Sequence, residues 1–131
     1  MEKRILRNSI ITPDGTELVS RHTYDYKQHI DKNKELYTND GGNDYIRRSI
    51  NQEPYLDNTI YDTDSIEKKR EHLEWGTYGK DGSEGFHYKK YKDMSNAHIE
   101  AIINDGYKGV YVEVLKEELE YRVKNDIFVE D

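Results

Sequence analysis

The hydrophobic pattern changes near residue 95, from short alternating segments to segments with helical spacing, and this change constrains the fold most strongly. Before it, Thr12–Gly15 is a turn in which proline presets one backbone dihedral angle and glycine supplies a positive one. The turn predicts a β-hairpin over residues 7–20. A second hairpin is expected over residues 21–38, around a polar turn at residues 31–34.

After the change of pattern, two helices are expected. Ser95 is a favourable N-cap for a helix over Asn96–Asn104, and Gly106 ends it. A second helix is predicted over Tyr111–Lys124. Its expected buried positions are Val112, Leu115, Leu119 and Val123, and its expected outward positions are Glu117, Glu118 and Glu120. The sequence therefore predicts an α+β fold, with an N-terminal antiparallel β-sheet followed by two C-terminal helices.

The middle of the chain is less regular. The adjacent glycines of Asp40–Asp44 allow a sharp turn, from which Arg47 and Arg48 emerge together. Residues 51–64 contain a proline and many Asn, Asp and Thr residues, so they are predicted to form a loop or an exchanged arm.

A third hairpin is predicted between the loop and the helices. Glu71–Tyr78 and Phe86–Tyr91 have the composition of paired strands, and residues 79–82 have that of a turn. Residues 66–73 fit either a short helical turn or the entry to a strand.

The size of the chain fits one compact domain, because 131 residues without a long low-complexity linker lie within the usual range. Hydrophobic residues make up 34% of the chain and charged residues 36%, so a single core would be thin and a subunit interface would help. The 12 tyrosines fit interfaces and planar ligands, although a codon bias explains such an excess equally well.

Composition also excludes several classes of protein. The absence of cysteine excludes disulfides and thiolate zinc sites, and the five histidines lack the short spacing of a metal site. We therefore expect no metal and no cofactor. A formal charge of −7 disfavours general binding to DNA, and the sequence has no apolar run of membrane-spanning length and no signal peptide. The expectation is a small intracellular protein.

No catalytic signature was found, but a set of binding candidates remains. The helix start at Ser95 and Asn96 offers free N–H groups to a phosphate, or it merely caps the helix. Phe86 would bring a ring for base stacking, or it belongs to the core. Three arginines offer forked donors to phosphates, or they form ordinary salt bridges. These arginines are Arg47, Arg48 and Arg122.

Five segments, in order along nearly the whole chain, resemble a known family. They are Met1–Asn8, Asp40–Arg48, Trp75–Gly82, Ser95–Ile102 and Glu117–Arg122. The sequence is similar in these segments to the phage anti-Thoeris sponges of the first type (Thoeris anti-defence one). None of the segments is a strong motif alone, and the five in series carry the resemblance.

The resemblance implies a phage protein of the host bacterial cytoplasm that sequesters glycocyclic ADP-ribose, the messenger of the Thoeris system, without cleaving it. It also implies dimers that can assemble into hexamers, and separate sites in some members for cyclic oligonucleotide signals of CBASS. Phe86 and Asn96 match the messenger pocket of the family, and Arg122 is carried over with them. Trp75, in one of the resembling segments, is a further candidate for ligand binding. Gly85 and Phe86 stand where members often have Pro and Leu, and residues 54–66 match nothing in the family.

Two other functions compete with the sponge. One is an enzyme that degrades a nucleotide signal, with His87 or His98 as acid or base. The other is an acidic inhibitor that binds a host defence protein directly, with its negative surface imitating nucleic acid.

Overall fold

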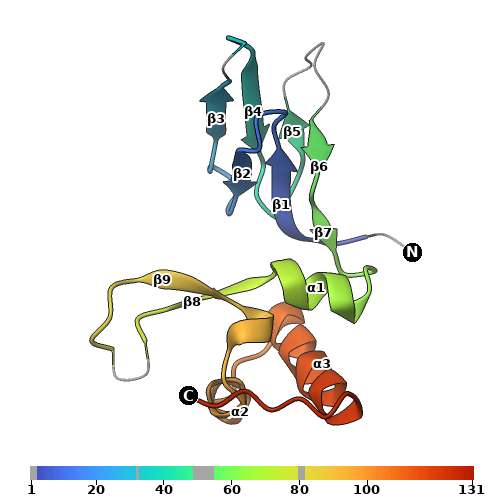
Figure 1. Cartoon of the computed structure of the whole chain (residues 1–131), viewed down its shortest axis with the longest axis vertical. Helices are drawn as coiled ribbons and strands as arrows, with labels where there is room; N and C mark the ends of the chain where they lie inside the picture. Colours follow the sequence, from blue (N-terminus) through green and yellow to red (C-terminus); the bar gives the residue numbers. More distant parts are fainter. Residues whose placement is uncertain (1–2, 32, 49–54, 80–81) are drawn as a thin grey trace. The chain divides into compact units, whose positions relative to one another are not determined.

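The computed structural model describes residues 3–31, 33–48, 55–79 and 82–131 (Figure 1). It divides the chain into two compact units, Met1–Thr63 (unit 1) and Asp64–Asp131 (unit 2). The strands of unit 1 and the helices at the C-terminus confirm the predicted α+β class. The expectation of one functional domain stays a prediction.

The first sheet of unit 1 is organised around one long strand. Strand β1 (Ile5–Ile11) pairs antiparallel with β2 (Glu17–Ser20), which confirms the first predicted hairpin. It also pairs with β6 (Leu56–Asp57) and β7 (Ile60–Tyr61). The prediction of a loop over 51–64 was therefore wrong at residues 56–57 and 60–61, while 62–64 form a turn, and 51–54 lie outside the described residues. The short strands form because the buried backbone of β1 needs hydrogen-bond partners on its second edge.

The second sheet has the order β3 (Lys27–Ile30), β4 (Leu36–Asp40), β5 (Arg47–Arg48). Its β3–β4 hairpin agrees with the second predicted hairpin. Gly41 and Gly42, which follow β4, both adopt positive φ angles. A Cβ atom on Gly42 would lie 2.2 Å from the backbone of His22, so only glycine fits this turn.

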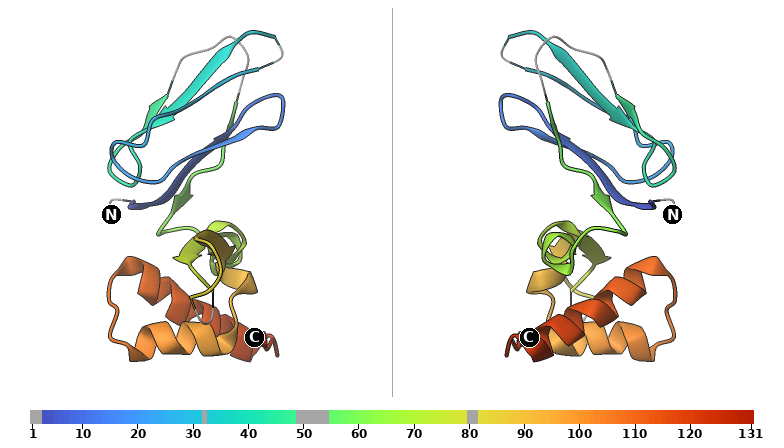
Figure 2. Two further views of the ribbon diagram at one scale, coloured as in Figure 1. Left: turned by 90° about the vertical axis from the view of Figure 1, so that its left-hand side faces the viewer. Right: turned by 90° about the vertical axis from the view of Figure 1, so that its right-hand side faces the viewer.

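The two sheets of unit 1 face each other as two layers (Figure 2). Ile10, Leu18 and Tyr37 form a small buried cluster between them, with Tyr55 packed against it. Polar side chains fill much of the remaining interior. Asn39 is fully buried and donates hydrogen bonds to the carbonyl oxygens of Asn8 and Leu18, at 3.1 and 2.9 Å.

Unit 2 contains a short helix, a hairpin and two longer helices. Helix α1 (Ile66–His72) is followed by β8 (Glu74–Thr77) and β9 (His87–Lys90), which pair antiparallel. A 3-10 turn, η1 (Tyr91–Asp93), leads into α2 (Asn96–Asn104) and α3 (Val110–Lys124). The buried hydrophobic side chains among the described residues of unit 2 are Leu73, Tyr91, Met94, Ile99, Ile102, Val112, Val114 and Leu115.

The helix ends that the sequence predicted in unit 2 are found in the structure. The Ser95 side chain accepts a hydrogen bond from the His98 N–H, which confirms the predicted N-cap. Gly106 has a φ of 85° just beyond α2, as its role in ending that helix requires. For residues 66–73 the sequence allowed a helical turn or a strand entry, and the structure has a helix, α1. Ser65 caps α1 in the same way as Ser95 caps α2.

The predicted buried face of α3 was wrong in two places. Val123 is 83% exposed, whereas Glu118, expected outside, is completely buried. Glu118 accepts hydrogen bonds from Arg122 on its own helix and from Arg70 on α1. These charged partners form hydrogen bonds with the buried carboxylate, so Glu118 can lie on the buried face of α3.

The chain reverses direction after α3. Asp126 adopts a φ of 56°, and the N–H groups of Asp126 and Ile127 donate to the carbonyl oxygens of Val123 and Arg122. This is the Schellman arrangement, in which one left-handed residue ends the helix. The C-terminal segment, residues 126–131, then returns toward the start of α2, where Val129 meets Asn96.

None of the helices in the described part of the chain is long and apolar enough to cross a membrane.

Candidate functional site

A pocket of about 470 Å³ lies within unit 2, between the β8–β9 hairpin, the start of α2 and the C-terminal segment. This volume lies in the range of roughly 300–1,000 Å³ that small-molecule sites occupy. Ser95 and His98 line it from α2 and its cap, and Asp131 lines it from the C-terminal segment.

The hairpin turns one face toward this pocket. Residues directly opposite each other in an antiparallel pair share a face of the sheet. Thr77 pairs with His87, and Trp75 pairs with Lys89. Thr77, His87 and Lys89 all line the pocket, so they supply a hydroxyl, an imidazole and an ammonium group to its wall.

The opposite face of the hairpin carries an aromatic cluster of Tyr78, Phe86 and Tyr88. The Phe86 ring lies 5.2 Å from each tyrosine ring, centroid to centroid, in edge-to-face contacts. A Cβ atom on Gly76 would lie 2.6 Å from the Phe86 ring, so the ring rests directly on the backbone there. Phe86 is nevertheless 53% exposed, and a planar ligand can reach it. The alternative of a core phenylalanine is therefore wrong.

The Trp75 ring contacts Tyr107 edge to face, with the ring centroids 6.3 Å apart. Trp75 is half-buried and does not line the pocket, although its cross-strand partner Lys89 does. Its predicted role in ligand binding stays a prediction.

Ser95 and Asn96 lie where the sequence placed them, but both are engaged within the protein. The Ser95 hydroxyl caps α2 and lines the pocket. The Asn96 side-chain oxygen accepts hydrogen bonds from Arg122 at 2.6 Å and from the Val129 N–H at 3.1 Å. The Asn96 N–H donates to the Val129 carbonyl oxygen at 2.9 Å. The helix start is thus largely satisfied by the protein itself.

Arg122 is 1% exposed, and its guanidinium forms several hydrogen bonds within the protein. It donates to Glu118 at 2.7 Å, to Asn96 and to the carbonyl oxygens of Tyr91 and Lys92. This geometry favours a structural role for Arg122 over the predicted contact with a ligand.

The surroundings of His98 in the pocket shift its pKa. Burial lowers the pKa of His98, the nearby Lys89 ammonium lowers it further, and Asp131 opposes them by raising it. The imidazole is therefore mainly neutral at neutral pH, and it can donate or accept a hydrogen bond according to its tautomer.

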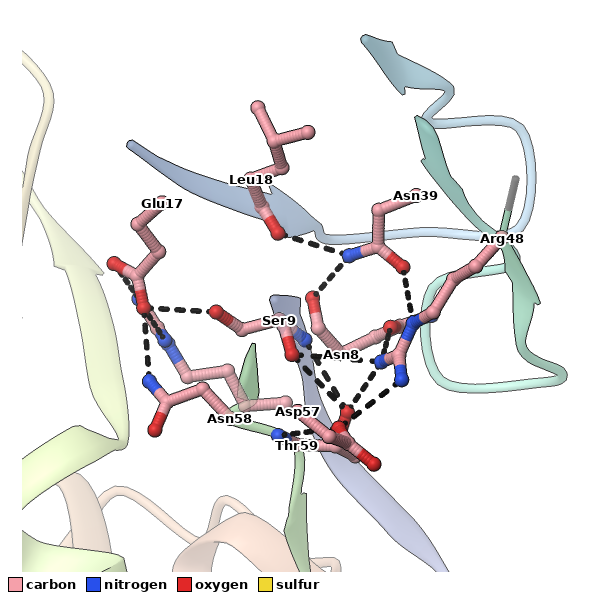
Figure 3. A network of polar contacts seen from close by, with 10 residues as sticks. Asn8, Ser9, Glu17, Leu18, Asn39, Arg48, Asp57, Asn58 and Thr59 are labelled. Carbon is pink, nitrogen blue, oxygen red and sulfur yellow. Dashed lines mark hydrogen bonds and ion pairs between the residues drawn. The ribbon is translucent and has the colours of Figure 1, made fainter. Parts of the chain in front are cut away.

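Arg47 and Arg48 belong to unit 1, so the structure does not place them at the pocket of unit 2. Arg47 is exposed and lies 5.7 Å from the centre of the Tyr45 ring. Arg48, whose side chain is 7% exposed, points into the interior of unit 1 (Figure 3). It donates to the side-chain oxygens of Asn8, Asn39 and Thr59 and pairs with Asp57 at 3.0 Å. Its donors are used by the fold.

Sequence reasoning missed several residues of the site. Tyr78, Tyr88 and Lys89 were not singled out, although the alternation of the predicted hairpin would have placed Tyr88 and Lys89 on opposite faces. His87 and His98 were considered as metal ligands and as catalytic groups but not as groups that bind a nucleotide, and both line the pocket. Among the described residues, no group of three His, Asp or Glu side chains could hold a metal ion.

Comparisons with protein-family models, with curated proteins and with solved structures found no match to this chain.

Proposed function

We propose that this chain binds a cyclic nucleotide signal of the glycocyclic ADP-ribose class at the unit 2 pocket and holds it without cleaving it. The observation that carries the proposal is the pocket itself, which is lined by hydroxyl, imidazole and ammonium groups beside the carboxylates of Glu84 and Asp131. The hydroxyl, imidazole and ammonium groups suit the phosphate and ribose oxygens of such a ligand.

The aromatic cluster is a second candidate for contact with the ligand. It lies on the face of the hairpin opposite the pocket-lining His87, so Phe86 contributes to binding only where the ligand extends past the edge of the hairpin. The Phe86 ring is exposed beside Tyr78 and Tyr88. Exposed rings of this kind stack on nucleobases of any sequence. The resemblance to the anti-Thoeris sponges points to the same position, although members of that family often have Leu there.

Calorimetric titration with glycocyclic ADP-ribose tests the proposal. The wild-type chain should bind the messenger, and Phe86→Ala should weaken binding by about tenfold to a hundredfold, since a base–aromatic stack contributes about 1–3 kcal/mol. Tyr24→Ala is a matched control, because Tyr24 is a 90% exposed aromatic residue of unit 1. Thermal melting of each variant separates loss of binding from loss of folding.

Unchanged affinity in a folded Phe86→Ala protein would remove Phe86 from the site. A wild-type chain that binds no messenger would sink the proposal and leave the acidic protein inhibitor as the better account.

A second candidate is hydrolysis of the signal, because the two histidines considered as acid and base, His87 and His98, both line the pocket. The experiment that separates the candidates is to mix protein and messenger, denature the protein by heat and analyse the supernatant. A sponge returns intact messenger in proportion to the protein added. An enzyme returns products, and it does so at substoichiometric concentration.

The proposed setting is the cytoplasm of a phage-infected bacterium, where the protein works as a dimer or a hexamer. Exposed aromatic residues on both units, including Tyr26 and Phe128, are compatible with subunit contacts. Binding of CBASS cyclic oligonucleotides at a separate site belongs to the same proposal and depends on the same family resemblance.

A further inference from the structure

We infer that Asn96 is a positioning residue, whose side-chain oxygen anchors the C-terminal segment as a wall of the unit 2 pocket. The expected effect of this anchoring on ligand affinity rests on the proposed function. The anchoring itself is a property of the chain that can be measured without any ligand.

The geometry at Asn96 leaves its side-chain oxygen no capacity for a ligand. A carbonyl oxygen has two lone pairs. Here one interaction comes from Arg122 Nη1 at 2.6 Å and the other from the Val129 N–H at 3.1 Å. The Asn96 N–H donates a hydrogen bond to the Val129 carbonyl oxygen at 2.9 Å, so Asn96 binds Val129 through both its backbone and its side chain.

A buried chain of charges holds this junction from behind. Arg122 is fixed by Glu118, at 2.7 Å, and Glu118 is itself held by two hydrogen bonds from Arg70 on α1. Glu118 has no exposed surface. Charge-assisted bonds in such a setting are shorter and stronger than neutral ones, so the position of the Arg122 guanidinium is tightly determined.

The segments that meet at this junction are those that carry the walls of the pocket. Arg122 binds the carbonyl oxygens of Tyr91 and Lys92, just after the pocket-lining Lys89. Asn96 lies between the lining residues Ser95 and Ala97, and Val129 lies two residues before the lining Asp131. Loosening the junction should therefore displace several walls together.

The test compares substitutions that keep or remove the acceptor oxygen. Asn96→Asp retains an oxygen for Arg122 and Val129 and removes the side-chain NH₂ group, whereas Asn96→Ala removes both. Val129→Pro removes the N–H that donates to Asn96 and leaves Asn96 intact. Asn104→Ala is the control, because Asn104 is an exposed asparagine at the other end of α2.

Hydrogen exchange of the C-terminal segment is the first readout. It should accelerate for residues 127–131 in Asn96→Ala and Val129→Pro, and it should stay as in the wild type in Asn96→Asp and Asn104→Ala. Affinity for glycocyclic ADP-ribose is the second readout. It should fall by about tenfold to a hundredfold in the first two variants and remain within about threefold in the other two.

Unchanged protection of residues 127–131 in folded Asn96→Ala would overturn the inference. So would loss of binding in Asn96→Asp combined with full affinity in Val129→Pro, because that pair of results assigns the Asn96 NH₂ group to the ligand. If the wild type binds no messenger, the proposed function fails, while the exchange measurement still decides whether Asn96 anchors the segment.

Discussion

The two units of this protein fill their interiors in different ways. Between the sheets of unit 1, a small apolar cluster around Ile10 and Tyr37 shares the space with buried polar side chains such as Asn8 and Asn39. Unit 2 has a larger apolar core on α2 and α3, and its buried charges are gathered at one place, around Glu118.

Both units nevertheless bury an arginine whose donors are directed to the protein. Arg48 binds four side chains of unit 1, and Arg122 binds Glu118, Asn96 and two carbonyl oxygens in unit 2. An arginine is often expected to bind phosphate because it presents forked donors. The comparison teaches that the same geometry serves folding when the surrounding acceptors are oxygens of the chain, so the candidate site is defined by the pocket rather than by these arginines.

The largest expected effect comes from breaking the polar interior of unit 1. Arg48→Ala leaves the buried side-chain oxygens of Asn8 and Asn39 without this donor, and each orphaned buried acceptor costs about 1–3 kcal/mol. We expect a loss of about 2–6 kcal/mol in the free energy of unfolding, measured by chemical denaturation.

The neighbouring Arg47→Ala is the control, because Arg47 is exposed and substitutions of this kind usually change stability by less than about 0.5 kcal/mol. Equal effects of the two substitutions would contradict the burial of Arg48 and restore it as a candidate ligand contact.

A smaller effect is expected from acid, and it should fall mainly on unit 1. Burial opposes ionisation of Glu17, but hydrogen bonds from Arg7, Ser9 and Asn58 outweigh it and lower the pKa of Glu17 to about 2. In unit 1, the pKa values of Asp14, Asp25 and Asp57 are lowered as well, whereas in unit 2 this holds for Glu71.

A carboxyl whose pKa is lowered by folding stabilises the protein above its unfolded pKa, and this stabilisation disappears as the pH falls through the folded pKa. For Glu17 the window runs from 4.5 down to about 2. Residue-resolved hydrogen exchange between pH 5 and pH 2.5, corrected for intrinsic rates, should show that unit 1 loses protection at a higher pH than unit 2. Glu17→Gln should reduce the difference in pH between the two losses of protection. Equal loss in both units would contradict this ranking.

The sequence predicted those parts of the fold that local chemistry decides. The Thr12–Gly15 turn, the Ser95 cap and the Gly106 stop each depend on a few neighbouring residues, and each was found as expected. The strands β6 and β7 were missed because two-residue strands carry no periodic pattern and exist only through their pairing with β1.

The inner face of α3 could not be predicted for a related reason. Helical periodicity predicts burial from apolar residues alone, so it predicted that Val123 is buried and that Glu118 is exposed, whereas the structure shows the reverse. The partner that allows Glu118 to be buried is Arg70, which is 48 residues away in the sequence. Of the pocket-lining residues, Ser95 was selected from its residue type, whereas the wall formed by Lys89, His98 and Asp131 needs the tertiary structure. Phe86 does not line the pocket, and its role stays a prediction.

The central claim is that a nucleotide signal is held at the pocket of unit 2. Hydrogen exchange of the wild-type chain, measured with and without saturating glycocyclic ADP-ribose, tests it most directly. The account predicts slower exchange in residues 84–101 and 127–131, with the β1–β2 and β3–β4 hairpins of unit 1 unchanged. Protection confined to unit 1, or no change anywhere at saturating messenger, would contradict it.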